Sequence, residues 1–401
     1  MVKSFILNRI LGFLSDLTPE YPGNNGLRDQ ILAIKWLKEN CASLKCDPNS
    51  ITLWGHSAGA GDVNLLALSP VSNHLFQRAI IQSGSAFAYW SYDKHHTERY
   101  QSYREYFKCK HLPENITSTN NALTLLIKNC LLNVTLEKLF EFRYALIDSP
   151  GPINDAFLGA ENSIIYYSPQ EMLANANDNF YKIDILTGIN RVEGYAFEGY
   201  FSTSVDNWRR SVNVPEIALT LERYSLLLRD KCMQNSIISN RLKFDNYYQS
   251  KIKPKLNPDE DNHNFFSGRL KAIFANSDSI FDAGFIGFLK AYYNLKQNMN
   301  NNPSSLYVYE YLHENSANRQ NYNQFKKFLK NNYSMSTHFD GIDLVFGLPV
   351  GYRLLNRHAA LKKAGKHIPY ENFVFDSFFN ENDYKLSIII MTYFTNFVKT
   401  G

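Results

Sequence analysis

The motif G-H-S-A-G at residues 55–59 is the feature that most constrains the fold. It follows a short β-rich run at residues 51–54 and precedes small residues that open an apolar helix. A serine in this strand–turn–helix setting is typical of a nucleophile elbow, whose sharp turn projects the Ser57 hydroxyl above a sheet. The tightness of this turn explains why glycine stands at both ends of the motif, as Gly55 and Gly59, because side chains there would have no room. A glycine-rich turn with an incidental serine remains the alternative, since G-x-S-x-G also occurs by chance.

The elbow also places a hydrogen-bond donor. Ala58 follows the serine and would be the first residue of the helix, so its backbone N–H points away from the helix body. Such a donor stabilises an oxyanion that forms next to the nucleophile. We therefore expect Ala58 to contribute to an oxyanion hole.

Further runs along the chain predict alternating helices and strands. Apolar residues recur at helical spacing over residues 27–44. Short β-rich runs at residues 78–82 and 183–186 predict buried strands, and the run at residues 306–312 predicts a longer strand. Helices that alternate with such strands indicate an α/β protein with a largely parallel sheet.

The composition of the chain argues against several classes of function. Apolar residues make up 44% and charged residues 20% of 401 residues, which is typical of a globular protein with a buried core. With 42 basic and 38 acidic residues, the net charge of +4 argues against nucleic acid as a partner. No apolar run reaches the ~18 residues that a membrane span requires.

Five segments of the chain resemble the type-B carboxylesterases, the family that includes the cholinesterases. The likeness lies in the loop before the elbow, the elbow itself, the segment after it and two later loops: residues 22–30, 47–60, 69–85, 188–194 and 338–349. This resemblance implies an α/β-hydrolase fold, with a central mostly parallel sheet flanked by helices. Because the resemblance extends along the chain, we expect a single domain, residues 1–401.

The resemblance also implies a catalytic triad of Ser57, Glu193 and His338. The order Ser…Glu…His along the chain is the one that α/β-hydrolases use. Ser83 matches a buried serine that lies near the triad acid in the family, so we expect it to support the site.

Each partner of the serine has competitors in the sequence. His56 is the histidine nearest to Ser57, but we expect its side chain to leave the turn in another direction. Glu198, Asp184 and Asp340 compete with Glu193 for the acid. His56 also stands where many family members have glutamate, which favours a general carboxylesterase over a cholinesterase.

The activity that the resemblance implies is serine carboxylic-ester hydrolysis through an acyl-enzyme. The substrate would be a small-molecule carboxylic ester, and the chemistry requires no metal and no organic cofactor. The alternative is a catalytically inactive, cholinesterase-like adhesion or binding protein on the same fold.

The sequence departs from the family pattern near both ends. It contains no H-G-G, the motif whose backbone N–H groups form most of the family's oxyanion hole. Residues 7–15 resemble a shortened version of a family segment, and residues 395–401 match a point beyond which family members continue. We therefore expect a domain that is incomplete at the N-terminus and C-terminus, without its N-terminal strands. Such a chain would be poorly soluble and would hydrolyse esters weakly, or would be a non-functional truncated product.

The cysteines and sequons suggest an oxidising compartment. The resemblance implies a disulfide between Cys109 and Cys130. We expect Cys41 on a buried helix face, and the state of Cys41 and Cys46 stays open, with free structural thiols as the plain alternative. Glycosylation sequons begin at three asparagines: Asn115, Asn133 and Asn332. We expect the complete protein to be secreted or in the ER lumen.

Overall fold

The computed structural model describes residues 10–109, 129–130, 133–135, 138, 150–197, 250, 255, 270, 273–297, 304–317, 323, 325–326, 328–330, 333–351, 353 and 379–401. These residues fall into two compact units. The first unit comprises Met1–Ile185 and Gly284–Leu306, and the second comprises Leu186–Ala283 and Tyr307–Gly401.

The helices and strands follow one another in this order: α1 (Ile10–Phe13), α2 (Asn25–Leu44), β1 (Thr52–His56), α3 (Ala58–Leu68), β2 (Arg78–Gln82), α4 (His96–Tyr106), η2 (Ala156–Leu158), α7 (Pro169–Ala174), η3 (Phe180–Lys182), β3 (Asp184–Asn190), η4 (Glu193–Phe197), η10 (Ser277–Asp282), α12 (Ala283–Gln297), β4 (Leu306–Tyr311), α14 (Asp340–Val345) and α16 (Glu381–Thr400). The predicted strand at residues 78–82 is confirmed, and the predicted strand at residues 183–186 is longer in the structure.

The first unit contains a parallel strand pair, as the sequence predicts. β1 and β2 run parallel, with Thr52 opposite Arg78. Parallel neighbours require a crossover between them, and α3 supplies it. β3 begins in this unit, where the Asp184 N–H donates to the Gln77 carbonyl oxygen.

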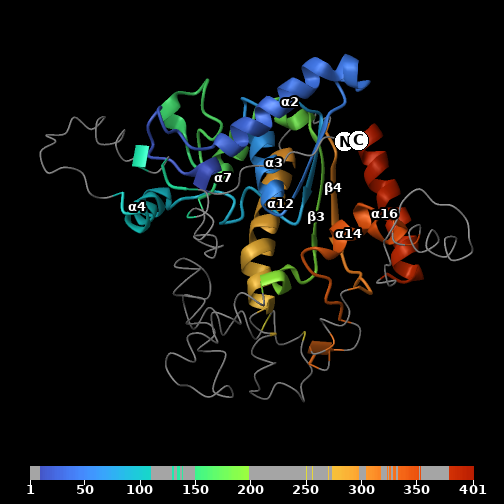
Figure 1. Ribbon diagram of the computed structural model, residues 1–401. Coiled ribbons are helices and arrows are strands. Elements are labelled where there is room, and N and C mark those ends of the chain that lie inside the picture. The colour runs from blue at the N-terminus through green and yellow to red at the C-terminus, as the bar shows by residue number, and fades with distance from the viewer. Residues whose placement is uncertain are drawn as a thin grey trace, which may run out of the picture. The chain divides into compact units, whose positions relative to one another are not determined.

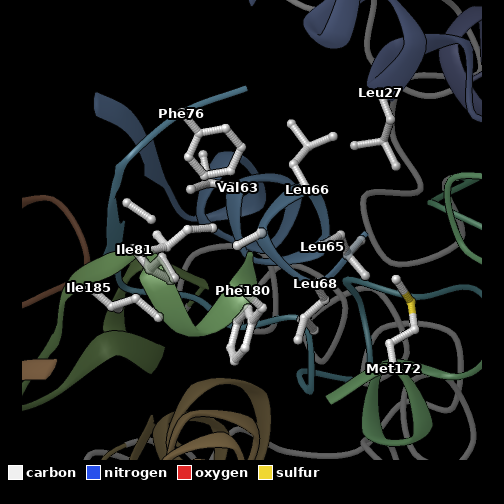
Figure 2. Close-up of a cluster of buried hydrophobic side chains, with 14 of the residues drawn as sticks. Leu27, Val63, Leu65, Leu66, Leu68, Phe76, Ile81, Met172, Phe180 and Ile185 are labelled. Atoms are coloured by element: carbon white, nitrogen blue, oxygen red, sulfur yellow. The ribbon is translucent and has the colours of Figure 1, made fainter. Parts of the chain in front are cut away.

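Helix α3 lies within the apolar core of the first unit. Its residues from Ala60 to Leu68 are all buried, as expected of a helix that is apolar on every side. Figure 2 shows the side chains of this core, to which α2, α3, β2, α7, η3 and β3 all contribute: Leu27, Val63, Leu65, Leu66, Leu68, Phe76, Ile81, Met172, Phe180 and Ile185. This packing fixes the position of the helix that follows the elbow.

Helix α2 covers the predicted range 27–44 and begins two residues earlier, after Asn24. Asn24 has a left-handed backbone with φ 52°. Its amide nitrogen donates to the Ile153 carbonyl oxygen at 2.8 Å, and its amide oxygen accepts the Ile153 N–H at 2.9 Å. This paired contact fixes the start of the helix.

The end of α2 shows the state of two cysteines that the sequence left open. Cys41 is buried, as predicted, and it forms a disulfide with Cys46 across the left-handed turn at Lys45. The alternative of two free structural thiols is therefore excluded. The two Cα atoms lie 4.7 Å apart because the helix ends in a turn that brings Cys46 back toward the last helical residues.

The second unit contains most of β3 and β4, which are neighbours in the sheet (Figure 1). The Arg191 N–H, just after β3, donates to the carbonyl oxygen of Tyr311. Gly188 lies against the ring of Tyr309, and an added Cβ would stand 2.5 Å from the ring carbons. Glycine therefore permits the close approach of the two strands at this point.

Helix α16 packs against β4 through aromatic pairs. The Phe397 ring contacts Tyr307 and the Phe394 ring contacts Tyr309, each with centroids 5.9 Å apart. The Ser387 hydroxyl donates to the Leu344 carbonyl oxygen at 2.7 Å and joins α16 to α14. Among the described residues, no helix combines the length and hydropathy of a membrane-crossing segment.

Candidate active site

Ser57 occupies a strained turn between β1 and α3. Its backbone has φ 59° and ψ −122°, a region that side chains rarely adopt. The Ser57 N–H donates to the Gln82 carbonyl oxygen at 2.9 Å, and the Ser57 carbonyl oxygen accepts the Ala60 N–H at 2.9 Å. The turn is thus held by β2 on one side and by α3 on the other.

The close packing of this turn rests on two glycines. A Cβ on Gly55 would lie 1.9 Å from the Gly59 carbonyl oxygen, and one on Gly84 would lie 2.5 Å from the Ser57 carbonyl oxygen. A Cβ on Gly59 would meet nothing within 4 Å. The expectation of crowding is therefore confirmed at Gly55 and wrong at Gly59, whose backbone is the surface that Gly55 contacts.

The Ser57 side chain is placed at the start of α3 without serving as its cap. Serine at this position usually accepts a hydrogen bond from the first helical turn, but the Ser57 side chain makes no capping bond. Ser57 is partly exposed and Ala58 is exposed. The hydroxyl and the Ala58 backbone therefore lie at the positive end of the helix dipole, which favours negative charge.

In the second unit, Glu193 and His338 form a buried pair. The imidazole Nδ1 lies 2.6 Å from the carboxylate Oε2, and the two side chains are 1% and 0% exposed. The other carboxylate oxygen, Oε1, accepts the Asn190 N–H at 2.6 Å. Because the carboxylate can only accept, Nδ1 carries the proton and the neutral ring has its lone pair on Nε2. The pair therefore presents the tautomer that a general base requires.

The competing acids have other roles in the structure. The Asp340 carboxylate accepts the Thr337 N–H at 2.9 Å at the start of α14, and the Asp184 carboxylate accepts the Ser305 N–H at 2.8 Å. Glu198 lies outside the described residues. His56 is the last residue of β1. Of the candidate pairs in the described residues, the structure brings Glu193 and His338 together.

Ser83 directly follows β2 and is 1% exposed, which confirms that it is buried. Its backbone is left-handed, with φ 55°. Its expected role beside the acid remains a prediction.

Several residues around the pair were not anticipated. The Gly194 N–H donates to the Ser277 hydroxyl oxygen at 2.9 Å, and the ring of Phe281 lies 4.6 Å from the His338 ring, centroid to centroid. Both Ser277 and Phe281 belong to η10, a π-helical segment. They lie more than 50 residues from either member of the pair, so no local motif could identify them.

Two buried carboxyl groups have raised pKa values. Burial raises the pKa of Asp62, on α3, to about 7, although a hydrogen bond from the Gln30 amide at 2.8 Å opposes the shift. Burial, together with the charges of Asp278 and Glu193, raises the pKa of Asp282 to about 8. Gln30 is thus the hydrogen-bond partner of the buried Asp62 carboxyl group.

The predicted disulfide and one sequon lie in the described residues. Cys109 and Cys130 are bonded, which confirms that prediction. Asn133 is exposed. Asn115 and Asn332 lie outside the described residues.

Comparison with known proteins yields one family match and three kinds of relative. The sequence profile of the carboxylesterase family matches residues 8–401. Neuroligin-2 of Rattus norvegicus is 29% identical over 395 residues, which are 98% of this chain and 39% of that protein. The chain thus spans about two fifths of the length of this relative.

Two further relatives match shorter stretches at higher identity. Esterase FE4 of Myzus persicae is 54% identical over 82 residues, 20% of this chain and 14% of the esterase. Cholinesterase 1 of Branchiostoma lanceolatum is 34% identical over 192 residues, 46% of this chain and 50% of the cholinesterase.

Proposed function

The chain belongs to the carboxylesterase family and has its α/β-hydrolase fold, and on that premise we propose that it is a serine carboxylic-ester hydrolase. Ser57 is the nucleophile, His338 the general base and Glu193 the acid that orients it. The observation that carries this proposal is the buried 2.6 Å contact between the His338 Nδ1 and the Glu193 Oε2. A buried histidine with this partner and this tautomer matches the role of a general base.

The proposed reaction passes through an acyl-enzyme. The Ser57 hydroxyl attacks the ester carbonyl carbon while the His338 Nε2 takes its proton, because a serine hydroxyl is a poor nucleophile without a base. The Ala58 N–H stabilises the oxyanion, and the alkoxide leaves with the proton from Nε2. Water then attacks the acyl group in the same way and regenerates Ser57. No metal or organic cofactor enters these steps.

The strained turn at Ser57 supports the role of the serine. A φ of 59° is costly for a residue with a side chain, and β2, α3 and the two close glycines hold the turn in this state. This backbone conformation holds the Ser57 hydroxyl at the start of α3, where it makes no capping hydrogen bond. Ser83 is buried and directly follows Gln82, whose carbonyl oxygen accepts the Ser57 N–H, and it is proposed to support the site.

A second candidate function is a non-catalytic binding protein on the same fold. The observation that favours it is the extent of the alignments: the neuroligin covers 98% of this chain, whereas the two relatives named as esterases cover 20% and 46%. A binding protein of this kind would act through its surface and would need no reactive serine.

The two disulfides support a location in an oxidising compartment. Cys41–Cys46 and Cys109–Cys130 are both formed, and such bonds persist mainly outside the reducing cytosol. We propose that the protein is secreted or resides in the ER lumen, with Asn133 as a glycosylation site.

Labelling with a fluorophosphonate probe distinguishes the two functions. The probe reacts covalently with an activated serine, so the full chain should be labelled, and the label should disappear in Ser57→Ala. The matched control is Ser85→Ala, which removes a buried serine hydroxyl elsewhere in the first unit and should remain labelled. A folded chain that takes no label would support the non-catalytic candidate.

A further inference from the structure

One six-residue segment contacts both the residue that follows the acid and the base itself. Segment η10 (Ser277–Asp282) is π-helical, and such segments are rare and occur frequently at functional sites. The Ser277 hydroxyl oxygen accepts the N–H of Gly194, the residue after Glu193. An added Cβ on Gly194 would stand 2.5 Å from the Ser277 nitrogen, so the two backbones are in close contact. The position of the acid thus depends on η10.

The same segment packs against the base. The Phe281 ring is 2% exposed and lies 4.6 Å from the imidazole of His338, with an angle of 45° between the ring planes. The ring of Phe339 contacts the same imidazole at 4.9 Å and 73°. The base is therefore bounded by two aromatic rings and hydrogen-bonded to the Glu193 carboxylate.

Two physical effects follow from these rings. They restrict rotation of the imidazole, which keeps Nδ1 directed at the carboxylate. They also lie within the distance at which an aromatic ring attracts a positive charge. Because His338 becomes positively charged only after it takes a proton, such an attraction is stronger in the transition state than in the resting enzyme.

We propose that Phe281, assisted by Phe339, is a positioning residue that orients His338 and stabilises its protonated form. This inference rests on the proposed function, in which His338 is the general base. Phe281 does not touch the reacting atoms in this scheme and acts through the imidazole.

The charged groups around this arrangement are shared by all the variants below. Glu193 faces the imidazole Nδ1. Asp278 and Asp282 lie on η10, and the Lys255 ammonium is 4.0 Å from the Asp278 carboxylate. Asp340 follows His338 by two residues and is hydrogen-bonded to Thr337. A difference between variants therefore reports the rings and not these charges.

The test compares Phe281→Leu with Phe288→Leu in the full chain. Phe288 is also buried and also contacts an aromatic ring, Phe87, but it lies in the core of the first unit. With a nitrophenyl ester, Phe281→Leu should lower kcat about tenfold and leave KM within about twofold. Phe281→Tyr keeps the ring and should recover most of the loss, and Phe288→Leu should leave kcat nearly unchanged.

A second readout does not depend on activity. The proton NMR signal of the imidazole Nδ1–H, which donates to Glu193, should broaden in Phe281→Leu relative to wild type, because an imidazole that is freer to rotate exchanges this proton with water more rapidly. Phe339→Leu removes a 54% exposed ring, so it should fold normally and broaden the signal in the same way. A signal that is unchanged in both variants would overturn the inference. Failure of Ser57 labelling would instead refute the proposed function and leave this comparison intact.

Discussion

Glu193 and His338 are 145 residues apart in the chain, yet the carboxylate Oε2 and the imidazole Nδ1 stand 2.6 Å apart with both side chains buried. The remaining carboxylate oxygen accepts a backbone N–H from Asn190. Both oxygens are thus engaged, and the carboxylate holds one orientation. This arrangement fixes the imidazole tautomer, with the proton on Nδ1.

Glu193→Gln should reduce kcat by about three to four orders of magnitude with little loss of stability. The amide keeps the shape of the side chain, and its oxygen can still accept the Asn190 N–H. Its NH₂ group then faces Nδ1 and forces the proton onto Nε2, the atom that must act as the base. Steady-state kinetics with a nitrophenyl ester measure the effect. Glu310→Gln is the control, because that carboxylate is about half exposed and pairs with Arg191; a loss of similar size there would contradict the assignment.

Asp62 should make the first unit less stable at alkaline pH. Burial raises its folded-state pKa to about 7, above the ordinary value near 3.9. Between these values the folded state binds more protons than the unfolded state, so stability falls as pH rises from about 4 to about 7. Asp62→Asn keeps a partner for Gln30 and should be more stable than wild type at pH 8, by on the order of 2–4 kcal/mol. Urea unfolding at pH 5 and pH 8 measures the difference, and an equal difference at both values would contradict the prediction.

Asp383 should stabilise the start of α16 and lose this effect in acid. Burial opposes ionisation, but hydrogen bonds from Ser316, His313 and the Asn380 N–H together lower the pKa of Asp383. A lowered folded-state pKa means that the stabilisation is present above the ordinary pKa near 4 and is lost as pH falls through the folded-state value. Asp383→Ala should cost about 1–2 kcal/mol at pH 7, since it also removes the capping box.

The acid dependence of that effect is the discriminating result. Thermal unfolding of wild type and Asp383→Ala should differ at pH 7, and the difference should narrow as the pH falls below the ordinary carboxyl pKa near 4. Asn382→Ala, on the same helical turn, is the control, because only its backbone N–H joins the cap. A difference between wild type and Asp383→Ala that is the same size at every pH down to the acid limit of the folded state would argue against an ionised Asp383 as the cause.

The two disulfides should differ in their contribution to stability. Cys41–Cys46 closes a loop of only 5 residues, whereas Cys109–Cys130 closes one of 21. Loop-closure entropy then gives about 2 kcal/mol for the short loop and about 3 kcal/mol for the long one. Paired Cys→Ala variants of each bond, unfolded in urea, measure the order. A larger loss from the short loop would show that native-state contacts, rather than chain entropy, dominate.

Local signals allowed much of the fold to be predicted. The elbow could be read because β1, the turn and α3 are contiguous, and the strand at residues 78–82 has the apolar centre A-I-I. The prediction for β3 stopped at residue 186, because polar residues and Gly188 interrupt its pattern. Its continuation depends on the Tyr309 ring of the neighbouring strand, which fills the space above the glycine.

Features of the site that depend on tertiary contacts could not be predicted. Ser277 contacts Gly194, the residue after the acid, from 83 residues away along the chain, and Phe281 contacts His338 from 57 residues away. The partner of Asp62 comes from α2, on the far side of β1 in the sequence. The Cys41–Cys46 bond depends on a left-handed turn at Lys45, a residue type that gives no signal for such a backbone.

The most direct test of the account is a crystal structure of the full chain after reaction with a fluorophosphonate. We expect a covalent bond between phosphorus and the Ser57 Oγ, with the His338 Nε2 within about 3.2 Å of a phosphonyl or serine oxygen. The Glu193 carboxylate should remain bonded to Nδ1. An adduct on another residue, or an imidazole directed away from the modified serine, would contradict the proposed chemistry.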